Sequence, residues 1–242
     1  GARVFLACRS EDKARAALSR LRDQVPEGEF DYLHLDLADL SSVKRCAEQF
    51  LDGQNRLDIL VNNAGVMIPP YSQTKDGFEL QFGTNHLGHF ALTAHLIDVV
   101  IATPASRVVT VSSMAHRFGR IRFDDLQRTQ NYNRWLTYGQ SKVANLIFSY
   151  ELQRRLAATK VGTLAIAAHP GWARTNLTTH SRLTDWVAPL LAQSAVAGAA
   201  PTIRAATDPA AQPGSYYGPR WFEIRGGAVT VGSTSYSRRL DI

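Results

Sequence analysis

The amino-acid sequence predicts a single α/β domain, built on a doubly wound parallel sheet with helices on both faces. Short apolar runs alternate with longer amphipathic runs along all 242 residues, and neither a linker nor an internal repeat divides them. The apolar runs are nearly continuous, as expected for strands that are covered on both faces. Because strands and helices alternating at this spacing form parallel sheets, we expect one domain over residues 1–242.

The expected strands are short runs rich in branched apolar residues, and the expected helices are the longer amphipathic runs between them. The strands cover residues 4–8, 30–35, 57–62, 107–113, 163–169 and, as a short final strand, 228–232. The helices cover residues 11–23, 41–51, 85–102, 137–158 and 187–206. Ser41 suits a helix N-cap, and Pro201 is expected to break the last helix because it lacks an amide hydrogen.

Two stretches, 114–136 and 172–186, match neither pattern. Each follows the carboxyl end of an expected strand, which is where open α/β sheets bind their ligands. We therefore expect both stretches to be functional loops.

Composition narrows the class of partner. The net charge of +6 comes from 27 Lys and Arg against 21 Asp and Glu, and it could attract nucleic acid, an anionic membrane or a phosphorylated cofactor, or only maintain solubility. The arginines are dispersed rather than gathered in a run, so we expect a small-molecule substrate and no nucleic-acid partner. No apolar run is long enough to predict a membrane span.

Cysteine usage predicts a reducing compartment. Cys8 and Cys46 are the only cysteines, and their spacing indicates neither a disulfide framework nor a metal site. We therefore expect a cytoplasmic location and no bound metal.

The segment LTYGQSKVANLIFSYEL, residues 136–152, places Tyr138 four residues before Lys142. Four residues make about one helical turn, so both side chains stand on one face of the expected helix. An ammonium near a phenol favours the charged phenolate, which predicts a lowered pKa for Tyr138. Alone, such a pair is common on solvated helices, so the interpretation depends on the surrounding residues.

Further polar groups gather at the same sheet edge. RVVTVSS ends a strand in Ser112 and Ser113, VNNAG ends another in a turn of small residues, and Asn85 in TNHLGHF opens or interrupts a helix. Each has an ordinary structural interpretation: Ser113 as a turn residue, Asn63 as an Asx turn and Asn85 as a cap. Their common location where ligands bind favours a functional site.

The ordered motifs VNNAG, TNHLGHF, VVTVSS, YGQSK and HPGWART resemble the short-chain dehydrogenase/reductases, from residue 1 to at least residue 175. The stretches LACRS, TNHLGHFALT and SKVANLIFSYEL resemble the retinol-dehydrogenase-like branch of that family. The resemblance implies a Rossmann-like fold. It also implies an oxidoreductase that uses NAD(P) to interconvert a carbonyl and a primary or secondary alcohol.

The resemblance implies roles for four catalytic residues. Tyr138 is the expected general acid and base, and Lys142 lowers its pKa and binds the nicotinamide ribose. Ser113 orients the substrate oxygen, and it is preferred to Ser112 because the second serine of such a pair is usually the family's catalytic one. Asn85 is expected to hold a proton-relay water near the lysine.

The expected cofactor is NADP rather than NAD. Enzymes that prefer NAD tend to have a carboxylate after this strand, whereas here Arg9 could pair with a 2′-phosphate; the alternative is that Arg9 is only a surface residue. The resemblance implies further cofactor contacts from Asp36 and Leu37 near the adenine, from Asn63, Ala64 and Gly65, from Tyr138 and Lys142, and from Pro170, Gly171 and the carboxamide-binding Thr175.

The family pattern begins with a strand and a turn of the form T-G-x-x-x-G-x-G, whereas GARVFLACRS already matches the family's second strand. We expect the first strand, in the middle of the sheet, and the glycine-rich turn upstream of residue 1. The pyrophosphate-binding residues are therefore not assigned.

Aromatic residues in and near the two loops predict an apolar or aromatic substrate, although several of them could serve only to pack the loops onto the sheet. They are Phe118, Tyr132, Trp135, Trp172, Trp186, Tyr216, Tyr217 and Phe222.

Two further expectations concern assembly and an alternative function. The helices over 85–102 and 137–158 resemble those that often form dimer interfaces in the family, so a homodimer or homotetramer is expected. The alternative function is a catalytically silent NADP(H)-binding regulator or scaffold. The retained set Asn85, Ser113, Tyr138 and Lys142 argues against it, because binding alone does not require proton-transfer groups.

Overall fold

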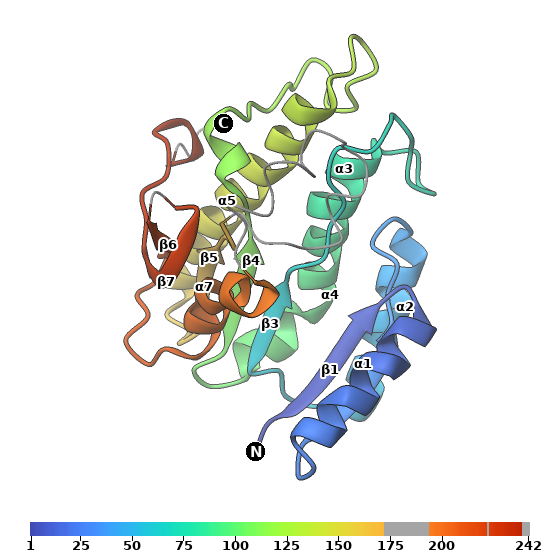
Figure 1. Cartoon of the computed structure of the whole chain (residues 1–242), viewed down its shortest axis with the longest axis vertical. Coiled ribbons are helices and arrows are strands. Elements are labelled where there is room, and N and C mark those ends of the chain that lie inside the picture. The colour runs from blue at the N-terminus through green and yellow to red at the C-terminus, as the bar shows by residue number, and fades with distance from the viewer. Residues whose placement is uncertain (172–193, 222, 239–242) are drawn as a thin grey trace.

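Parallel strands and their connecting helices form most of the computed structural model, which describes residues 1–171, 194–221 and 223–238 (Figure 1). The strands are β1 (Arg3–Cys8), β2 (Glu29–His34), β3 (Ile59–Asn62), β4 (Arg107–Val111), β5 (Leu164–Ala168), β6 (Tyr216–Trp221) and β7 (Arg225–Thr230). The α-helices are α1 (Glu11–Gln24), α2 (Leu40–Gly53), α3 (Leu80–Phe82), α4 (Gly88–Ala102), α5 (Arg134–Thr159) and α7 (Ala195–Thr207). A π-helical turn, Gly83–Leu87, joins α3 to α4, and 3-10 turns cover Met114–Arg117 and Tyr236–Arg238.

The described strands form two sheets. β1 and β2 pair in parallel, and a five-stranded sheet has the order β3-β4-β5-β6-β7. All neighbours in the larger sheet are parallel except β6 and β7, which are antiparallel. The strands β3, β4 and β5 therefore end at one common edge, which is the edge that carries the predicted site.

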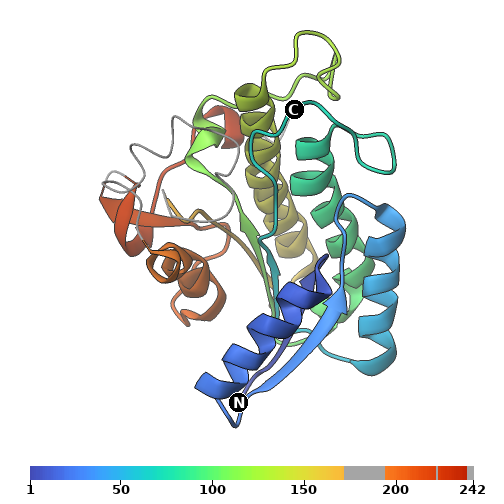
Figure 2. The same cartoon turned by 45° about the vertical axis from the view of Figure 1, so that its right-hand side comes forward.

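Helices cover both faces of the larger sheet, as the sequence predicts (Figure 2). On one face, Val109 of β4 and Ile166 of β5 pack with Ala205 of α7. On the opposite face, Val108 of β4 packs with residues of α2 and α4, and Ala167 of β5 packs with Leu146 of α5. This alternation along β4 and β5 confirms the doubly wound α/β class.

Two helices begin at caps that the sequence interpretation missed. Asp39, rather than Ser41, caps α2, because its Oδ1 accepts the Ser41 amide at 2.9 Å. Asn133 caps α5 by accepting the amides of Trp135 and Leu136 at 3.0 and 3.1 Å. The longer of these helices therefore begins before the predicted residue 137, and its second turn carries the YGQSK motif.

The C-terminal part departs most from the predictions. Pro201 lies inside α7 and does not break it, since packing of the helix against the sheet compensates for the missing amide donor. β6 was not predicted, because YYGPRW contains glycine and proline within the strand. β7 begins at Arg225, before the predicted start at residue 228.

β1 and β3 each pair on one side only, so each is an edge of its sheet. Apolar side chains on both are exposed, with Val4 at 41%, Ile59 at 39% and Val61 at 40%. The expected strand upstream of residue 1 stays a prediction. Across the described ranges, no helix combines the length and apolar character needed to cross a bilayer.

Candidate active site

Tyr138 and Lys142 lie on α5, one turn apart, beside the end of β4. Both are buried, with 8% and 5% of their surface exposed. The Lys142 Nζ donates to the main-chain carbonyl of Val111 at 3.2 Å and lies over the Tyr138 ring, 5.7 Å from its centroid. The predicted pair is therefore directed toward the sheet rather than toward solvent.

The two serines that follow β4 have different partners. The Ser113 hydroxyl acts on the Tyr138 phenol and lowers its pKa. The Ser112 Oγ instead donates to the main-chain carbonyl of Lys142 at 2.8 Å, and it is fully buried. This difference supports the preference for Ser113 as the residue that acts with Tyr138.

Asn85 lies in the π-helical turn between α3 and α4, so it interrupts the helix. Its Oδ1 accepts the Val66 amide at 2.7 Å, and its Nδ2 donates to the Val66 carbonyl at 2.9 Å and to the Ser141 hydroxyl at 3.0 Å. Its own main-chain carbonyl accepts Nδ1 of His89 at 2.9 Å. The expected relay water at Asn85 stays a prediction.

Gly65 allows the turn after β3 to approach these residues closely. A Cβ at this position would lie 2.7 Å from Oδ1 of Asn85 and 3.8 Å from Nζ of Lys142. The small residue in VNNAG therefore brings the turn against the predicted catalytic groups. Asn63 and Ala64, in the same turn, are exposed.

Burial dominates the electrostatics of the site. It raises the pKa of Tyr138 to about 12, and the hydrogen bond from Ser113 opposes this rise. Burial also lowers the pKa of Lys142 to about 8. The predicted lowering of the Tyr138 pKa is therefore wrong. Among the groups of the protein itself, desolvation of the phenol has the largest effect on this pKa, and it raises the value.

The predicted adenosine-binding residues lie after β1 and β2. Arg9 is exposed directly after β1, and no hydrogen bond or ion pair with another described residue engages its side chain. Asp36 closes a turn by accepting the Ala38 amide at 2.9 Å, and the adjacent Leu37 is buried. A Cβ at Gly88 would lie 2.5 Å from the Leu37 carbonyl, so α4 and this turn are in close contact.

The HPGWART segment is described only in part. Pro170 and Gly171 follow β5, and Gly171 has φ +67, a conformation that favours glycine. A Cβ there would also lie 2.4 Å from the Ile224 carbonyl. Thr175 lies outside the described residues, as do the predicted pocket residues Trp172, Trp186 and Phe222.

Two contacts near Tyr138 were not predicted. Gly119 packs against the Gly139 carbonyl, which a Cβ would meet at 2.1 Å. Gln140 is fully buried and holds segment 120–128: its Oε1 accepts the Arg122 amide and Nε of Arg128, and its Nε2 donates to the Leu126 carbonyl at 2.9 Å. The sequence signal for these hydrogen bonds is Gln140 itself, a polar residue inside the YGQSK motif.

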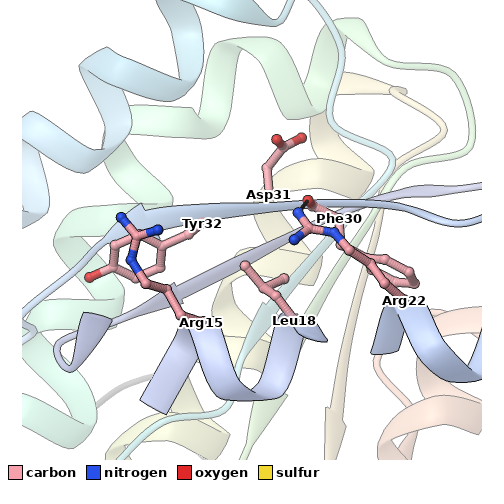
Figure 3. A pocket seen from close by; sticks show the side chains of 6 residues that line it. All are labelled: Arg15, Leu18, Arg22, Phe30, Asp31 and Tyr32. Atoms are coloured by element: carbon pink, nitrogen blue, oxygen red, sulfur yellow. Dashed lines mark hydrogen bonds between the residues drawn. The ribbon is translucent and has the colours of Figure 1, made fainter. Parts of the chain in front are cut away.

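A hollow of about 260 Å³ lies between α1 and β2, apart from these residues (Figure 3). It is lined by Arg15, Leu18, Arg22, Phe30, Asp31 and Tyr32. Its arginines are already engaged, since Arg15 pairs with Glu11 and Arg22 donates to the Phe30 carbonyl at 3.0 Å. None of the predicted site residues lines it.

The site fits a nicotinamide dinucleotide. The Lys142 ammonium has three donors, and among the described residues one hydrogen bond, to Val111, engages it. Two donors are thus left for ribose hydroxyls, and the missing Cβ of Gly65 keeps the adjoining space open. Such a cofactor would be held by Lys142 and the Gly65 turn, with Arg9 at the adenosine end.

Comparisons with known proteins match this arrangement. The family model described as short chain dehydrogenase matches residues 1–186. Retinol dehydrogenase 12 of Mus musculus is 46% identical over 183 residues, which cover 76% of this chain and 57% of that protein. Retinol dehydrogenase 14 of Homo sapiens is 40% identical over 240 residues, covering 90% of this chain and 71% of that protein.

A solved structure agrees over nearly the whole chain. It is the crystal structure of an uncharacterized protein from Mycobacterium Paratuberculosis, with a TM-score of 0.79 and 44% identity, and it covers 99% of this chain and 79% of the other. The chain spans less than two thirds of the length of the mouse relative.

Proposed function

The chain belongs to the short-chain dehydrogenase family, in its retinol-dehydrogenase-like branch, and on that premise we propose an NADP(H)-dependent oxidoreductase. In this proposal it interconverts a carbonyl and a primary or secondary alcohol, with Tyr138 as the general acid and base. The observation that carries the proposal is the position of the buried Lys142 ammonium over the Tyr138 ring, together with the Ser113 hydroxyl that lowers the pKa of the same phenol.

The protein's own groups handle the oxygen and its proton. When bound, the nicotinamide cofactor supplies or accepts the hydride. In the reduction direction, the Ser113 hydroxyl donates to the carbonyl oxygen and holds it near the phenol. Tyr138 then gives its proton to that oxygen as negative charge develops there. Oxidation uses the same groups in reverse, with the phenolate accepting the alcohol's proton.

Lys142 has two parts in this mechanism. Its positive charge stabilises the phenolate that remains after proton transfer, because burial strengthens the interaction between charges. Its two remaining donors bind the cofactor ribose. Asn85 holds the turn after β3 against both groups, through its paired hydrogen bonds to Val66.

The preference for NADP rests on Arg9. Its exposed guanidinium follows β1, where it can pair with a 2′-phosphate in a bidentate manner. Among the polar groups near the end of β1, Arg9 is the one suited to bind that phosphate. The stretch LACRS contains no carboxylate that could bind the ribose of NAD.

We propose an apolar or aromatic substrate. Met67, Ile68 and Ala115 pack around Tyr138, so the approach to the phenol has an apolar wall. Because the similar mouse and human proteins are named retinol dehydrogenases, retinoid aldehydes belong in the substrate panel beside aromatic ketones.

A fluorescence titration of the purified protein with NADPH, and in parallel with NADH, is the first test. The proposal expects saturable NADPH binding, with weaker NADH binding. Failure of both cofactors to bind would contradict it. Turnover of the substrate panel, followed by the loss of NADPH absorbance, then tests the chemistry.

Tyr138→Phe distinguishes the enzyme from the alternative, a silent NADP(H)-binding regulator. The enzyme should lose turnover by roughly 10²- to 10⁴-fold, the usual contribution of a positioned proton donor, while keeping its NADPH affinity. The regulator would be favoured if the wild-type protein bound NADPH but reduced no carbonyl of the panel, and if Tyr138→Phe left its regulatory effect unchanged.

A homodimer or homotetramer stays a prediction, as does a cytoplasmic location. Val143 and Leu146 lie on a face of α5 that is fully buried. On another face of this helix, Phe148 packs on Phe90 of α4, with the ring centroids 5.6 Å apart. Phe90 is itself 51% exposed, which leaves it as an apolar contact for a second copy. Sedimentation of the purified protein tests this assembly.

A further inference from the structure

His116 is fully buried on the 3-10 turn that follows the catalytic serine, and its Nδ1 lies 2.7 Å from the main-chain oxygen of Ser113. We propose that His116 is a positioning residue, whose Nδ1–H holds the Ser113 carbonyl and so directs the Ser113 hydroxyl toward Tyr138. The proposal rests on the proposed function, because it assigns a role at the same site. It concerns a side chain that touches neither the substrate nor the cofactor.

The hydrogen bond fixes the tautomer of the ring. A carbonyl oxygen can only accept, so Nδ1 must carry the proton. Burial lowers the pKa of His116, which favours a neutral ring with a single N–H. Nε2 is then unprotonated, and it has no hydrogen-bond partner among the described residues. The only N–H of this imidazole is therefore used on Ser113.

The Ser113 carbonyl receives two donors from the same residue. The His116 main-chain amide donates to it at 3.0 Å, in addition to the ring Nδ1. Ser113 itself is extended, with φ −159 and ψ 160, and its Oγ accepts the Ala115 amide at 3.2 Å. These bonds fix the carbonyl and the Oγ of Ser113, and from that position the hydroxyl acts on the Tyr138 phenol.

Tyr216 of β6 keeps the imidazole in place. Its ring meets His116 edge-on, with centroids 5.4 Å apart, and its hydroxyl lies 3.4 Å from Nδ1. Ser112 partly offsets the rise in the Tyr216 pKa that burial causes, and the Ser112 Oγ donates to the Lys142 carbonyl at 2.8 Å. The last parallel strand thereby supports both serines, and the imidazole cannot turn without displacing a buried aromatic ring.

Two carboxamide variants separate this role from simple packing. In His116→Asn, the amide nitrogen is as many bonds from Cα as Nδ1 is, so it can donate to the Ser113 carbonyl. In His116→Gln, the amide nitrogen corresponds to Nε2, and the Ser113 carbonyl loses its side-chain donor. Both variants remove the ring, so the loss of packing is common to them.

The first experiment measures steady-state kinetics of carbonyl reduction by the purified protein with NADPH. We expect His116→Gln to lower kcat by roughly 10- to 100-fold, because a misplaced catalytic group costs about that much, with KM and NADPH affinity within about twofold. His116→Asn should recover most of kcat. Equal kcat in the two variants would overturn the proposal. So would changes in kcat and KM that are the same size in both variants and that parallel their loss of thermal stability.

Crystal structures of the wild type and both variants give a readout that does not need activity. The proposal expects the Ser113 carbonyl to turn, and the Ser113 hydroxyl to move away from the Tyr138 phenol, in His116→Gln but not in His116→Asn. An unchanged Ser113 in His116→Gln would overturn it. If the wild type reduces no carbonyl, the proposed function fails, and these structures alone decide whether His116 positions Ser113.

Discussion

The ammonium nitrogen of Lys142 lies over the ring of Tyr138, 5.7 Å from its centroid, and donates to the main-chain carbonyl of Val111 at 3.2 Å. The lysine is thus held at the end of β4, while the Ser113 hydroxyl lowers the pKa of the phenol. Burial moves the two pKa values in opposite directions, to about 8 for Lys142 and to about 12 for Tyr138. Each group is thereby biased toward its neutral form, which makes the site sensitive to alkaline pH.

NADPH affinity should fall as the pH rises through about 8. If the Lys142 ammonium binds the cofactor ribose, NADPH prefers the protonated protein, and affinity declines once the free site loses its proton near its pKa of about 8. The dissociation constant, measured by fluorescence titration at a series of pH values, checks this. Lys142→Met should bind more weakly below that pH and lack the decline; a decline that persists in this variant would assign it to another group.

Lys142→Met should also make the protein more stable at neutral pH. The folded pKa of about 8 lies below the ordinary 10.5, so at pH 7 the buried charge costs roughly 3 kcal/mol in the free energy of unfolding. Replacing it should recover about 1–3 kcal/mol while removing activity. Urea unfolding of both proteins at pH 7 measures the difference.

The pH dependence of that difference provides the control. Between the folded and unfolded pKa values, the unfolded state binds more protons, so wild-type stability rises as the pH rises from about 8 toward 10. The stability gap between Lys142→Met and the wild type should therefore narrow at about pH 9.5. A gap that does not change with pH would mean that it arises from packing rather than from charge.

Gly65→Ala should disrupt the site without unfolding the domain. Its Cβ would lie 2.7 Å from Oδ1 of Asn85, an atom already held by the Val66 amide. Displacement of Asn85 should lower turnover by roughly 10- to 100-fold. Gly53→Ala is the matched control, because nothing lies within 4 Å of a Cβ there; equal activity in the two variants would contradict the proposed role of the close approach.

Arg9→Gln should weaken NADPH binding by roughly 10- to 100-fold and leave NADH binding unchanged, since a charge-assisted hydrogen bond contributes about 1.5–3 kcal/mol. Parallel titrations of the variant with both cofactors measure this. Arg20→Gln removes another exposed arginine, on α1, and should have no selective effect. Equal weakening of NADPH and NADH in Arg9→Gln would contradict phosphate recognition.

The site was more predictable from the sequence than the C-terminal fold. Tyr138 and Lys142 share a helix, and Ser113 follows a strand end, so spacing and strand order were enough to bring them together. The cap at Asn133 was missed because the preceding loop has no periodic pattern. β6 was missed because Gly218 and Pro219 oppose strand propensity, which pairing with β5 and β7 overrides.

The sign of the Tyr138 pKa shift could not be predicted from sequence. Spacing places a cation near the phenol, but it does not reveal how deeply either group is buried. The same holds for His116 and Gln140, whose functions depend on partners that are distant in space or on a turn geometry that the sequence does not specify.

Gln140 joins the segment after the 3-10 turn to the helix that carries the proposed catalytic groups. Its one carboxamide bonds to Arg122, Leu126 and Arg128, so the whole segment 120–128 is attached to α5 two residues after Tyr138. Gln127 also accepts the Glu79 amide at 2.6 Å, and the Ile121 amide donates to the Tyr236 hydroxyl at 3.0 Å, so the segment is held from three parts of the chain. A replacement for 120–128 would therefore have to satisfy the buried carboxamide of Gln140 as well as the contacts with Glu79 and Tyr236.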